Sequence, residues 1–197
     1  MPEALTNRYI TLQNLSTEVN KMNSWIILAL GAIVLFGSNA TAGGEAMKNL
    51  EVKLGFAQVP ANHTCKGQDI SPRIEVDGLN ATAMAVIVDD IDATRGTFTH
   101  WIAWNIEPQK IIPEGIPRNA TVQKPIRALQ GVNSFGKIGY WGPCPPPGKP
   151  HRYYFRVYGL DMALNLSAGA SKQELERAMQ GHIVQQGEAM ATFGSSG

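Results

Sequence analysis

The sequence has only two cysteines and four histidines among its 197 residues. Two cysteines are too few for the disulfide-dense scaffolds of very small secreted domains. No C-x-x-C or H-x-x-x-H spacing is present, so the sequence predicts no metal site. It also has no G-x-S-x-G elbow, no P-loop and no strand–G-x-G-x-x-G–helix unit. These absences argue against the corresponding enzyme classes and against a bound cofactor.

The sequence also lacks an excess of charge of one sign and lacks any long apolar run. The 17 Lys and Arg nearly balance the 16 Asp and Glu, for a net charge of +1. This balance offers no basic field for nucleic acid and no acidic tail, so we expect no nucleic-acid partner. The longest apolar run, residues 25–37, has thirteen residues, whereas a membrane-spanning helix needs about twenty.

The apolar run at residues 25–37 is typical of the core of a signal peptide. The small-x-small pattern at Ala40-Thr41-Ala42 follows it and predicts cleavage before Gly43. Acids balance the bases ahead of the run, so two alternatives stay open: Met22 is the true start, or the segment remains as a membrane anchor. We therefore divide the chain into an extension with signal peptide or anchor, 1–42, and one domain, 43–197.

Six N-x-S/T sequons support export, to an extracellular or periplasmic location. Glycans attached at these sites would require exposed asparagines. Four of the six lie after the predicted cleavage site; the full set is Asn14, Asn39, Asn62, Asn80, Asn119 and Asn165.

Several segments have the composition of β-strands. Residues 83–90 read as a buried strand that ends in acids, residues 99–106 as a second strand, 124–131 as a shorter one and 151–160 as a fourth. Gly- and Pro-rich turns separate them, which favours an antiparallel β-sandwich in a mainly β fold. A capping box, Ser171 with Glu174, begins the one predicted helix, which an apolar stripe extends to about Gly187.

A rigid loop leads directly into the last of these strands. Five of the twelve prolines fall between Pro143 and Pro150, and proline fixes φ and removes a backbone donor. In the strand that follows, period two places His151, Tyr153 and Phe155 on one face. The stiff loop and the side chains of His151 and Tyr153 are therefore expected to lie together. An ordinary turn beside a half-buried strand explains these residues too.

Acids gather where the strand at residues 83–90 ends. Asp89, Asp90 and Asp92 follow a buried apolar run, and His100 begins the next strand. If the two strands pair, His100 lies beside these acids. The alternative is that the aspartates cap the backbone of a turn.

The sequence resembles the phosphatidylethanolamine-binding protein family, in its bacterial and archaeal, Raf kinase inhibitor-like branch. The motifs that carry the resemblance occur in the family's order over residues 47–193: DISP, VDDIDA, THWIAWNI, GYWGPCPPPGKPHRYYFRVYGLD and HIVQQGEAMATF. The resemblance implies a sandwich of two antiparallel sheets with peripheral helices, and an end pocket for phosphate monoesters or phospholipid head groups. It places Asp90, His100, Gly142, Pro143, His151 and Tyr153 in that pocket.

The same resemblance implies further roles. Phe98 takes the position of a rim aromatic and Asp92 a supporting one, although Ile91 replaces the proline that the family has between Asp90 and Asp92. We expect Asp90 to hold His100 in one tautomer and to raise its pKa, and the Gly142 N–H to be free for a ligand.

These expectations favour an exported binding protein over an enzyme, because no nucleophile stands out. Its partner would be an anionic small molecule or a lipid head group, with a protein partner not identified. The alternative function is inhibition of a serine-type hydrolase through the protein surface, a role with precedent in the family.

Cys65 and Cys144 either form a disulfide or remain two free thiols. Both lie near segments that the resemblance brings to the pocket end, and an exported chain meets an oxidising compartment. Free cysteines, however, are often buried as small apolar side chains. The balance favours two free thiols, with the bridge as the alternative.

Overall fold

The protein was analysed as a computed structural model that describes residues 48–194. The predicted signal segment and its cleavage site lie outside these residues. Two sheets form the fold: a seven-stranded sheet in the order β1-β10-β9-β4-β5-β8-β7 and a three-stranded sheet in the order β2-β3-β6. Neighbouring strands are antiparallel, except that β1 pairs with β10 in parallel. The strands are β1 (Lys48–Asn49), β2 (Glu51–Lys53), β3 (Ile74–Asp77), β4 (Ala83–Asp90), β5 (Phe98–Ile106), β6 (Ile111–Ile112), β7 (Thr121–Val122), β8 (Ala128–Gln130), β9 (His151–Leu160) and β10 (Ile183–Phe193).

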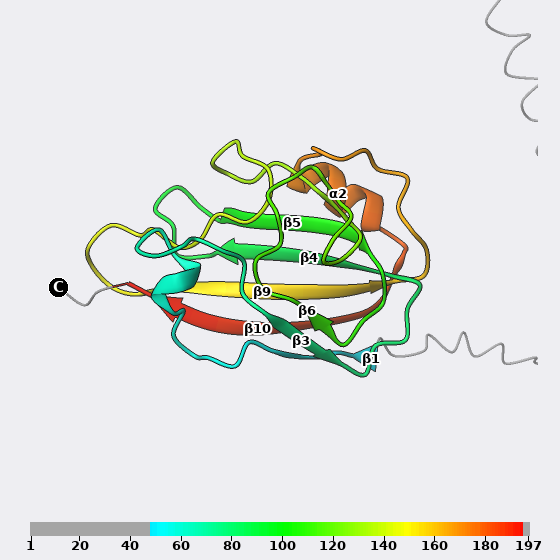
Figure 1. The fold of residues 1–197 in the computed structure, drawn as a ribbon, viewed down its shortest axis with the longest axis horizontal. Coiled ribbons are helices and arrows are strands. Elements are labelled where there is room, and N and C mark those ends of the chain that lie inside the picture. The colour runs from blue at the N-terminus through cyan, green and yellow to red at the C-terminus, as the bar shows by residue number, and fades with distance from the viewer. Residues whose placement is uncertain (1–47, 195–197) are drawn as a thin grey trace, which may run out of the picture. The chain divides into compact units, whose positions relative to one another are not determined.

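The main core lies between the two sheets. Figure 1 shows β5, β4, β9 and β10 side by side, with β3 and β6 of the small sheet crossing in front of them. Alternate residues of β4 and β9, such as Val86, Val88, Phe155 and Val157, point into this core and are fully or almost fully buried. The fold is therefore the predicted mainly β sandwich, and burial of these apolar side chains stabilises it.

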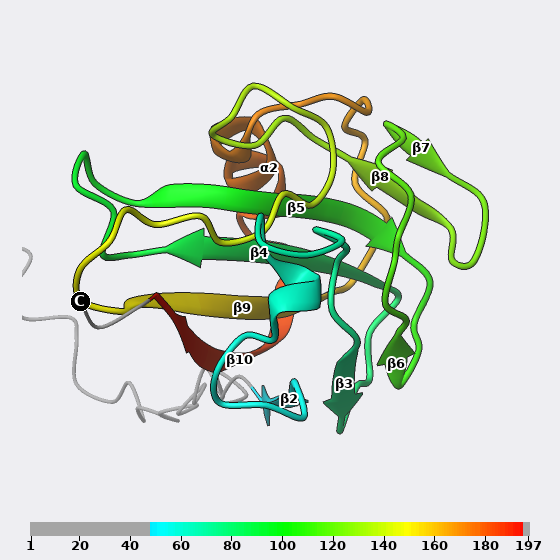
Figure 2. The same cartoon turned by 60° about the vertical axis from the view of Figure 1, so that its left-hand side comes forward.

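Helix α2 (Lys172–Met179) covers the opposite face of the large sheet. Figure 2 shows it on the far side of β5 from the small sheet. Leu175 and Met179 of the helix join a second apolar cluster with Ile87, Ile102 and Trp104. Among residues 48–194 the only other helix is the 3₁₀ turn η1 (Ala61–His63), and no helix there is long and apolar enough to cross a membrane.

The predicted capping box is present, but the predicted end of the helix is wrong. Ser171 accepts a hydrogen bond from the Glu174 N–H, and the Glu174 carboxylate accepts one from the Ser171 N–H. The helix ends at Met179, and Gly181 adopts a φ of +80° that few other residues tolerate. From Ile183 the chain is β10, which pairs with β9 as far as Phe193. Tertiary pairing thus overrides the helical spacing of His182 and Ile183.

The sequence placed three of the four long strands well, and missed β10, whose first residues it assigned to the helix. Residues 83–90 form β4 as predicted, β5 begins one residue early at Phe98, and β9 spans all of 151–160. The third predicted strand shortens to β8. The short strands β1, β2, β3, β6 and β7 were not predicted, because two to four residues carry too little periodicity to be recognised.

Candidate functional site

The ends of three neighbouring strands surround a small cavity. Asp90 ends β4, and its register partners are Phe98 at the start of β5 and Tyr153 near the start of β9. The cavity has a volume of about 160 Å³. Three loops complete its walls, and the lining residues are Asp90, Ala93, Thr94, Phe98, His100, Phe135, Cys144, Pro145, Pro146, His151 and Tyr153. Four of the six predicted pocket residues, with the predicted rim residue Phe98, are therefore together.

Asp90 pairs with His151 and makes no hydrogen bond to His100. Its Oδ2 lies 2.7 Å from His151 Nδ1 and its Oδ1 accepts the Asp92 N–H at 2.8 Å. The expected tautomer control of His100 by Asp90 is therefore wrong. The reason is the strand order: β4 lies between β5 and β9, so its last residue has a neighbour on both sides. Asp90 is buried, with 4 % of the residue exposed, and its carboxylate accepts hydrogen bonds from the His151 ring and the Asp92 N–H.

His100 is held by the backbone of the loop opposite. Its Nδ1 lies 2.5 Å from the Trp141 carbonyl oxygen, which only accepts, so Nδ1 carries the proton. Burial lowers the pKa of His100 below its usual 6.5, against smaller opposing effects of the Trp141 carbonyl and of Asp90. The expected rise in the pKa is therefore wrong, because the ring is only 3 % exposed and loses its hydration. A neutral ring with Nδ1 protonated leaves Nε2 as an acceptor.

Tyr153 places a hydroxyl without a partner on the cavity floor. The residue is fully buried, and its hydroxyl makes no well-formed hydrogen bond within the described residues, although the Asp90 carboxylate lies close by. Burial, with the negative charge of nearby Asp90, raises the pKa of Tyr153 well above 10, so the hydroxyl stays protonated. Its ring meets His100 edge to face at 5.4 Å between centroids. A buried donor with no acceptor lowers folding stability by about 1–3 kcal/mol. This point of the cavity is therefore a candidate position for an acceptor atom of a ligand.

Gly142 and Pro143 support the loop and do not line the cavity. The Gly142 N–H donates to Asp69 Oδ1 at 2.7 Å, so the prediction that it is free for a ligand is wrong. A Cβ at Gly142 would lie 2.1 Å from the His63 carbonyl oxygen, so this position requires glycine. The Pro143 carbonyl oxygen accepts the Cys65 N–H. Both residues fasten the proline loop to the segment that follows η1.

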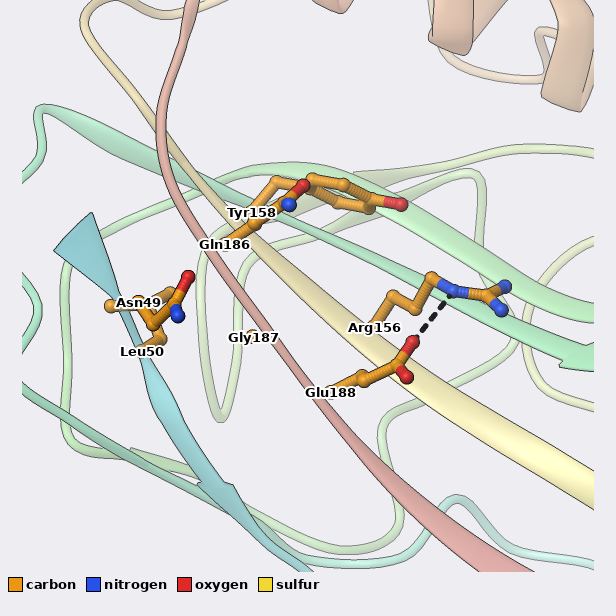
Figure 3. Close-up of a pocket in the computed structure, with 7 residues that line it drawn as sticks. All are labelled: Asn49, Leu50, Arg156, Tyr158, Gln186, Gly187 and Glu188. Carbon is orange, nitrogen blue, oxygen red and sulfur yellow. Dashed lines mark hydrogen bonds and ion pairs between the residues drawn. The ribbon is translucent and has the colours of Figure 1, made fainter. Parts of the chain in front are cut away.

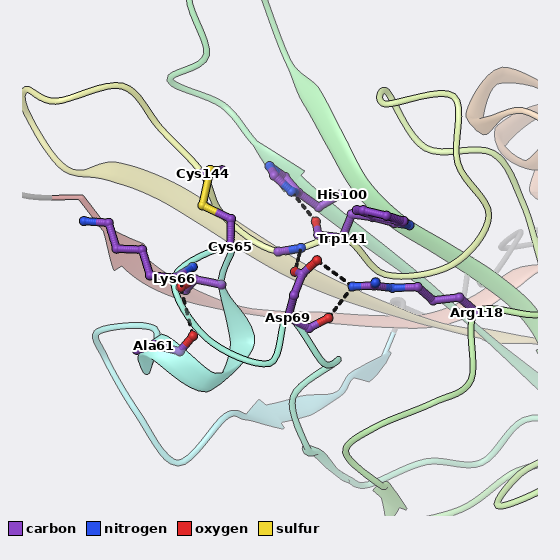
Figure 4. Close-up of a disulfide and its surroundings, with 10 residues drawn as sticks. Ala61, Cys65, Lys66, Asp69, His100, Arg118, Trp141 and Cys144 are labelled. Atoms are coloured by element: carbon purple, nitrogen blue, oxygen red, sulfur yellow. Dashed lines mark hydrogen bonds and ion pairs between the residues drawn. A yellow bond between two sulfur atoms is a disulfide. The ribbon is translucent and has the colours of Figure 1, made fainter.

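Asp69 and Arg118 brace the same loop (Figure 4). Arg118 donates to the Asp69 carboxylate at 2.6 Å and to the Tyr140 carbonyl at 2.7 Å, and its guanidinium lies 4.1 Å above the Trp141 ring. The same Trp141 fixes His100 through its carbonyl, so the brace orients the histidine. The DISP motif drew attention to Asp69, but only tertiary structure could reveal Arg118 as its partner.

The structure joins Cys65 and Cys144 in a disulfide. Their Cα atoms are 5.5 Å apart, within the range that a bridge allows. The preference for two free thiols is therefore wrong and the alternative of a bridge is the state found. The physical reason is the hydrogen bond from Cys65 N to the Pro143 carbonyl, which aligns the two segments beside each other (Figure 4).

Asp92 and Arg152 form an ion pair outside the cavity. Arg152 donates to both Asp92 oxygens, through Nε at 2.9 Å and Nη2 at 2.7 Å, and its backbone N–H donates as well. Asp92 thus supports the start of β9 and does not line the cavity. Despite the substitution of Ile91 for proline, the loop is held by this pair and by the bond between Asp90 and the Asp92 N–H.

We expect the Asp92–Arg152 pair to contribute to stability at neutral pH and to fail in acid. The Arg152 hydrogen bond lowers the pKa of Asp92 from 3.8 to about 2. A lowered pKa adds stability that is complete above the unfolded value and is lost as pH falls through the folded one. The Tm of Asp92→Asn should therefore lie below that of the parent at neutral pH and converge with it near pH 2. A constant difference across a pH series of thermal melts would contradict this.

A second hollow lies over β9 and β10, away from the cavity. It has a volume of about 460 Å³ and is lined by Asn49, Leu50, Arg156, Tyr158, Gln186, Gly187 and Glu188. Figure 3 shows Arg156 turned toward Glu188, at 3.1 Å from Nε to Oε2. Arg156 also pairs with Asp89. With its charges paired and no buried polar atom lacking a partner, this hollow is the weaker candidate.

Sequence reasoning did not find Phe135, which lines the cavity from the loop after β8. It also gave no role to Asp69 and did not find Arg118. None of these residues has a local signal that points to the site. Within residues 48–194 no group of three or more His, Cys, Asp or Glu could hold a metal ion. Fold and site together define a β-sandwich protein with a small end cavity, floored by two histidines, one tyrosine and one carboxylate.

Comparison with known proteins identifies the family. The model of the phosphatidylethanolamine-binding protein family matches residues 51–194. An UPF0098 protein of Pyrococcus horikoshii is 49% identical over 178 residues, covering 87% of this chain and 90% of that protein. One of Pyrococcus abyssi is 52% identical over 155 residues, covering 77% and 87%. The chain belongs to the phosphatidylethanolamine-binding protein family, as its motifs indicated.

Solved structures agree with this assignment. A phosphatidylethanolamine-binding protein homologue from Chlamydia trachomatis superposes with a TM-score of 0.66 at 34% identity, covering 75% of this chain and 97% of that one. YbcL of Escherichia coli, described as a member of the mammalian family, gives 0.67 at 26% identity, covering 75% and 99%. The family is thus one of binding proteins, and none of the relatives named here has an enzymatic name.

Proposed function

We propose that the end cavity binds the phosphate of a monoester or of a phospholipid head group, and that the protein acts by binding and not by catalysis. The observation that carries the proposal is the buried Tyr153 hydroxyl, a donor without an acceptor on the cavity floor. The two histidines beside it, His100 and His151, line the same cavity. A phosphate oxygen accepts hydrogen bonds from all three groups, the histidines once their Nε2 atoms are protonated.

The position of Asp90 is compatible with a bound anion because its carboxylate is paired with His151. Asp90 Oδ2 lies 2.7 Å from His151 Nδ1, so a proton taken up at Nε2 of His151 would have its counter-charge in place. Exposed cations in loops that line or flank the cavity, Lys66, Arg95 and Lys149, form no ion pair among residues 48–194. Such cations raise the local concentration of anions.

Tyr153→Phe tests the proposal, with opposite effects on binding and on stability. Loss of a hydrogen bond to a charged ligand should weaken phosphate binding by about 10- to 100-fold, or about 1.5–3 kcal/mol. The same change removes a buried donor without a partner, so Tm in the absence of phosphate should stay the same or rise. Calorimetric titration with inorganic phosphate and thermal melts measure the two effects.

A parent protein that fails to bind inorganic phosphate would overturn the proposal, and inhibition of a hydrolase through the surface would then be the function to test. If Tyr153→Phe binds inorganic phosphate as tightly as the parent protein, the Tyr153 hydroxyl takes no part in binding. Tyr158→Phe is the matched control, since Tyr158 lies on the same strand but lines the hollow over β9 and β10. Its phosphate affinity should equal that of the parent.

Anion binding should also take up a proton at His100. In the free protein the ring is neutral and Nε2 has no proton to donate, whereas a bound anion raises the ring pKa by attraction. Affinity should therefore be highest below the lowered free-state pKa of His100 and fall as pH rises through the higher pKa of the complex. Sulfate is the suitable probe because its own charge stays fixed across this range. His100→Gln should flatten the sulfate affinity profile, and an unchanged profile would contradict the role of His100.

We further propose that the domain works outside the cytoplasm. The four sequon asparagines within residues 48–194 are all exposed: Asn62, Asn80, Asn119 and Asn165. A disulfide between exposed cysteines persists in oxidising compartments. Amino-terminal sequencing of secreted protein should find Gly43 first; material that retains residues 25–37 would favour a membrane anchor instead.

A further inference from the structure

Aromatic rings form one wall of the cavity mouth. Phe135 meets Phe98 edge to face, with 4.7 Å between centroids, and meets His100 at 5.7 Å. Trp141 follows at 6.3 Å from Phe135. We call Phe98, His100 and Phe135 the aromatic wall; Trp141 contacts Phe135 but does not line the cavity. Pro145 and Pro146 of the proline loop also line the cavity, so apolar groups contribute much of the mouth above the polar floor.

Phe135 stays exposed although it belongs to this wall. Its exposed fraction is 44 %, among the highest for large apolar residues in the described part of the chain. Single exposed apolar residues are common on protein surfaces. Phe135 differs from these because its ring lines a cavity whose floor carries an unpaired buried donor.

The position of Phe135 is fixed by its own loop. The buried Asn133 side chain accepts the N–H groups of Phe135 at 2.9 Å and Lys137 at 3.1 Å, and donates to the Gly139 carbonyl at 3.0 Å. Ser134 bonds with Thr99 of β5 through its N–H and its hydroxyl. The ring is therefore presented at the mouth by an ordered loop, which lowers the cost of ordering it when a ligand binds.

We propose that Phe135 determines ligand specificity: the pocket selects phosphate monoesters that carry a flat apolar group next to the phosphate. The inference rests on the proposed phosphate site. A phosphate on the floor, near Tyr153 and the two histidines, directs its substituent toward the mouth. There an aromatic substituent covers the exposed Phe135 ring, and aromatic pairs gain energy beyond the burial of area. A polar substituent such as glycerol gains little from this wall and loses hydration.

The test compares three probes by calorimetric titration: inorganic phosphate, glycerol 3-phosphate and phenyl phosphate. The parent protein should bind phenyl phosphate about tenfold more tightly than the other two. Phe135→Ala should abolish this preference, measured within the variant as the ratio of its phenyl phosphate affinity to its inorganic phosphate affinity. Phe135→Leu, which keeps apolar area without a ring, should retain only part of it. Met190→Ala is the control, because Met190 is 45 % exposed on β10 and does not line the cavity.

The outcomes separate this inference from the proposed function. Absence of binding by all three probes would overturn both. Binding of inorganic phosphate without a preference for phenyl phosphate would overturn the role of Phe135 alone, as would a preference that survives in Phe135→Ala. Thermal melts of each variant verify that the loop and the sheet remain folded. A folded Phe135→Ala protein that binds inorganic phosphate, but binds phenyl phosphate no more tightly, supports the assignment.

Discussion

Reduction of the Cys65–Cys144 bridge should lower the free energy of unfolding by about 4–5 kcal/mol, because the bridge closes a long loop in the unfolded chain. The two cysteines are 79 positions apart in the sequence. Both are exposed in the folded protein, so a reductant reaches them without unfolding. Urea titration with and without reductant measures the change.

The double variant Cys65→Ser/Cys144→Ser provides the control. It should match the reduced parent in stability and be insensitive to reductant. The bridge also holds the cavity-lining Cys144 beside the segment after η1, so phosphate affinity should fall in the same samples. An intact mass that does not change on reduction would show two free thiols and contradict the bridge.

Replacement of Asp89 should produce the second large loss of stability, about 3 kcal/mol. The Asp89 side chain is 2 % exposed. Its Oδ2 lies 2.7 Å from Lys172 Nζ and 3.0 Å from Arg156 Nη1, and its Oδ1 accepts the Thr99 hydroxyl at 2.8 Å. Asp89→Ala removes the buried partner that these groups share: the Thr99 hydroxyl loses its acceptor, and Arg156 and Lys172 keep only the exposed Glu188 and Glu176. This estimated loss of stability is at the lower end of the range for a buried ion pair, because both cations keep some contact with water.

Asp161→Ala is the matched control for Asp89→Ala. Asp161 has one side-chain partner, His182, at 2.9 Å from Oδ1 to Nδ1, and both side chains are substantially exposed. Removal of an exposed pair should cost no more than about 1 kcal/mol. Chemical denaturation of the two variants tests the difference. Equal losses would show that burial of Asp89 does not strengthen its interactions.

Strands β4, β5 and β9 could be predicted from sequence because each has a recognisable strand pattern of its own. Val86 and Val88 belong to an unbroken apolar run, and β9 alternates apolar and polar residues over its length. The end of the helix could not be predicted, because His182 and Ile183 have the spacing of a helical stripe. What ends the helix is the left-handed backbone of Gly181 and the pairing of β10 with β9. The second of these depends on residues more than twenty positions away.

The site was predicted as a set of residues but not as a set of contacts. Family motifs contain His100, His151 and Tyr153, and the structure brings these residues to one cavity. Motifs do not reveal which acid meets which histidine. That pairing depends on β4 having β9 as well as β5 for a neighbour, so Asp90 reaches His151. The lowered pKa of His100 depends on burial, which no local pattern encodes.

The loop after β8, which the Asn133 side chain closes, carries residues of the cavity mouth but no strand of the sheet. The side-chain amide of Asn133 makes hydrogen bonds to the backbone on both sides of Gly136, so the hydrogen bonds that close the loop do not involve the side chains of Phe135 and Lys137. Exchange of these two side chains should therefore alter the mouth of the cavity while the proposed phosphate-binding floor, built on β4, β5 and β9, stays intact. Point substitutions in this single surface turn should thus change ligand choice with little loss of folding stability.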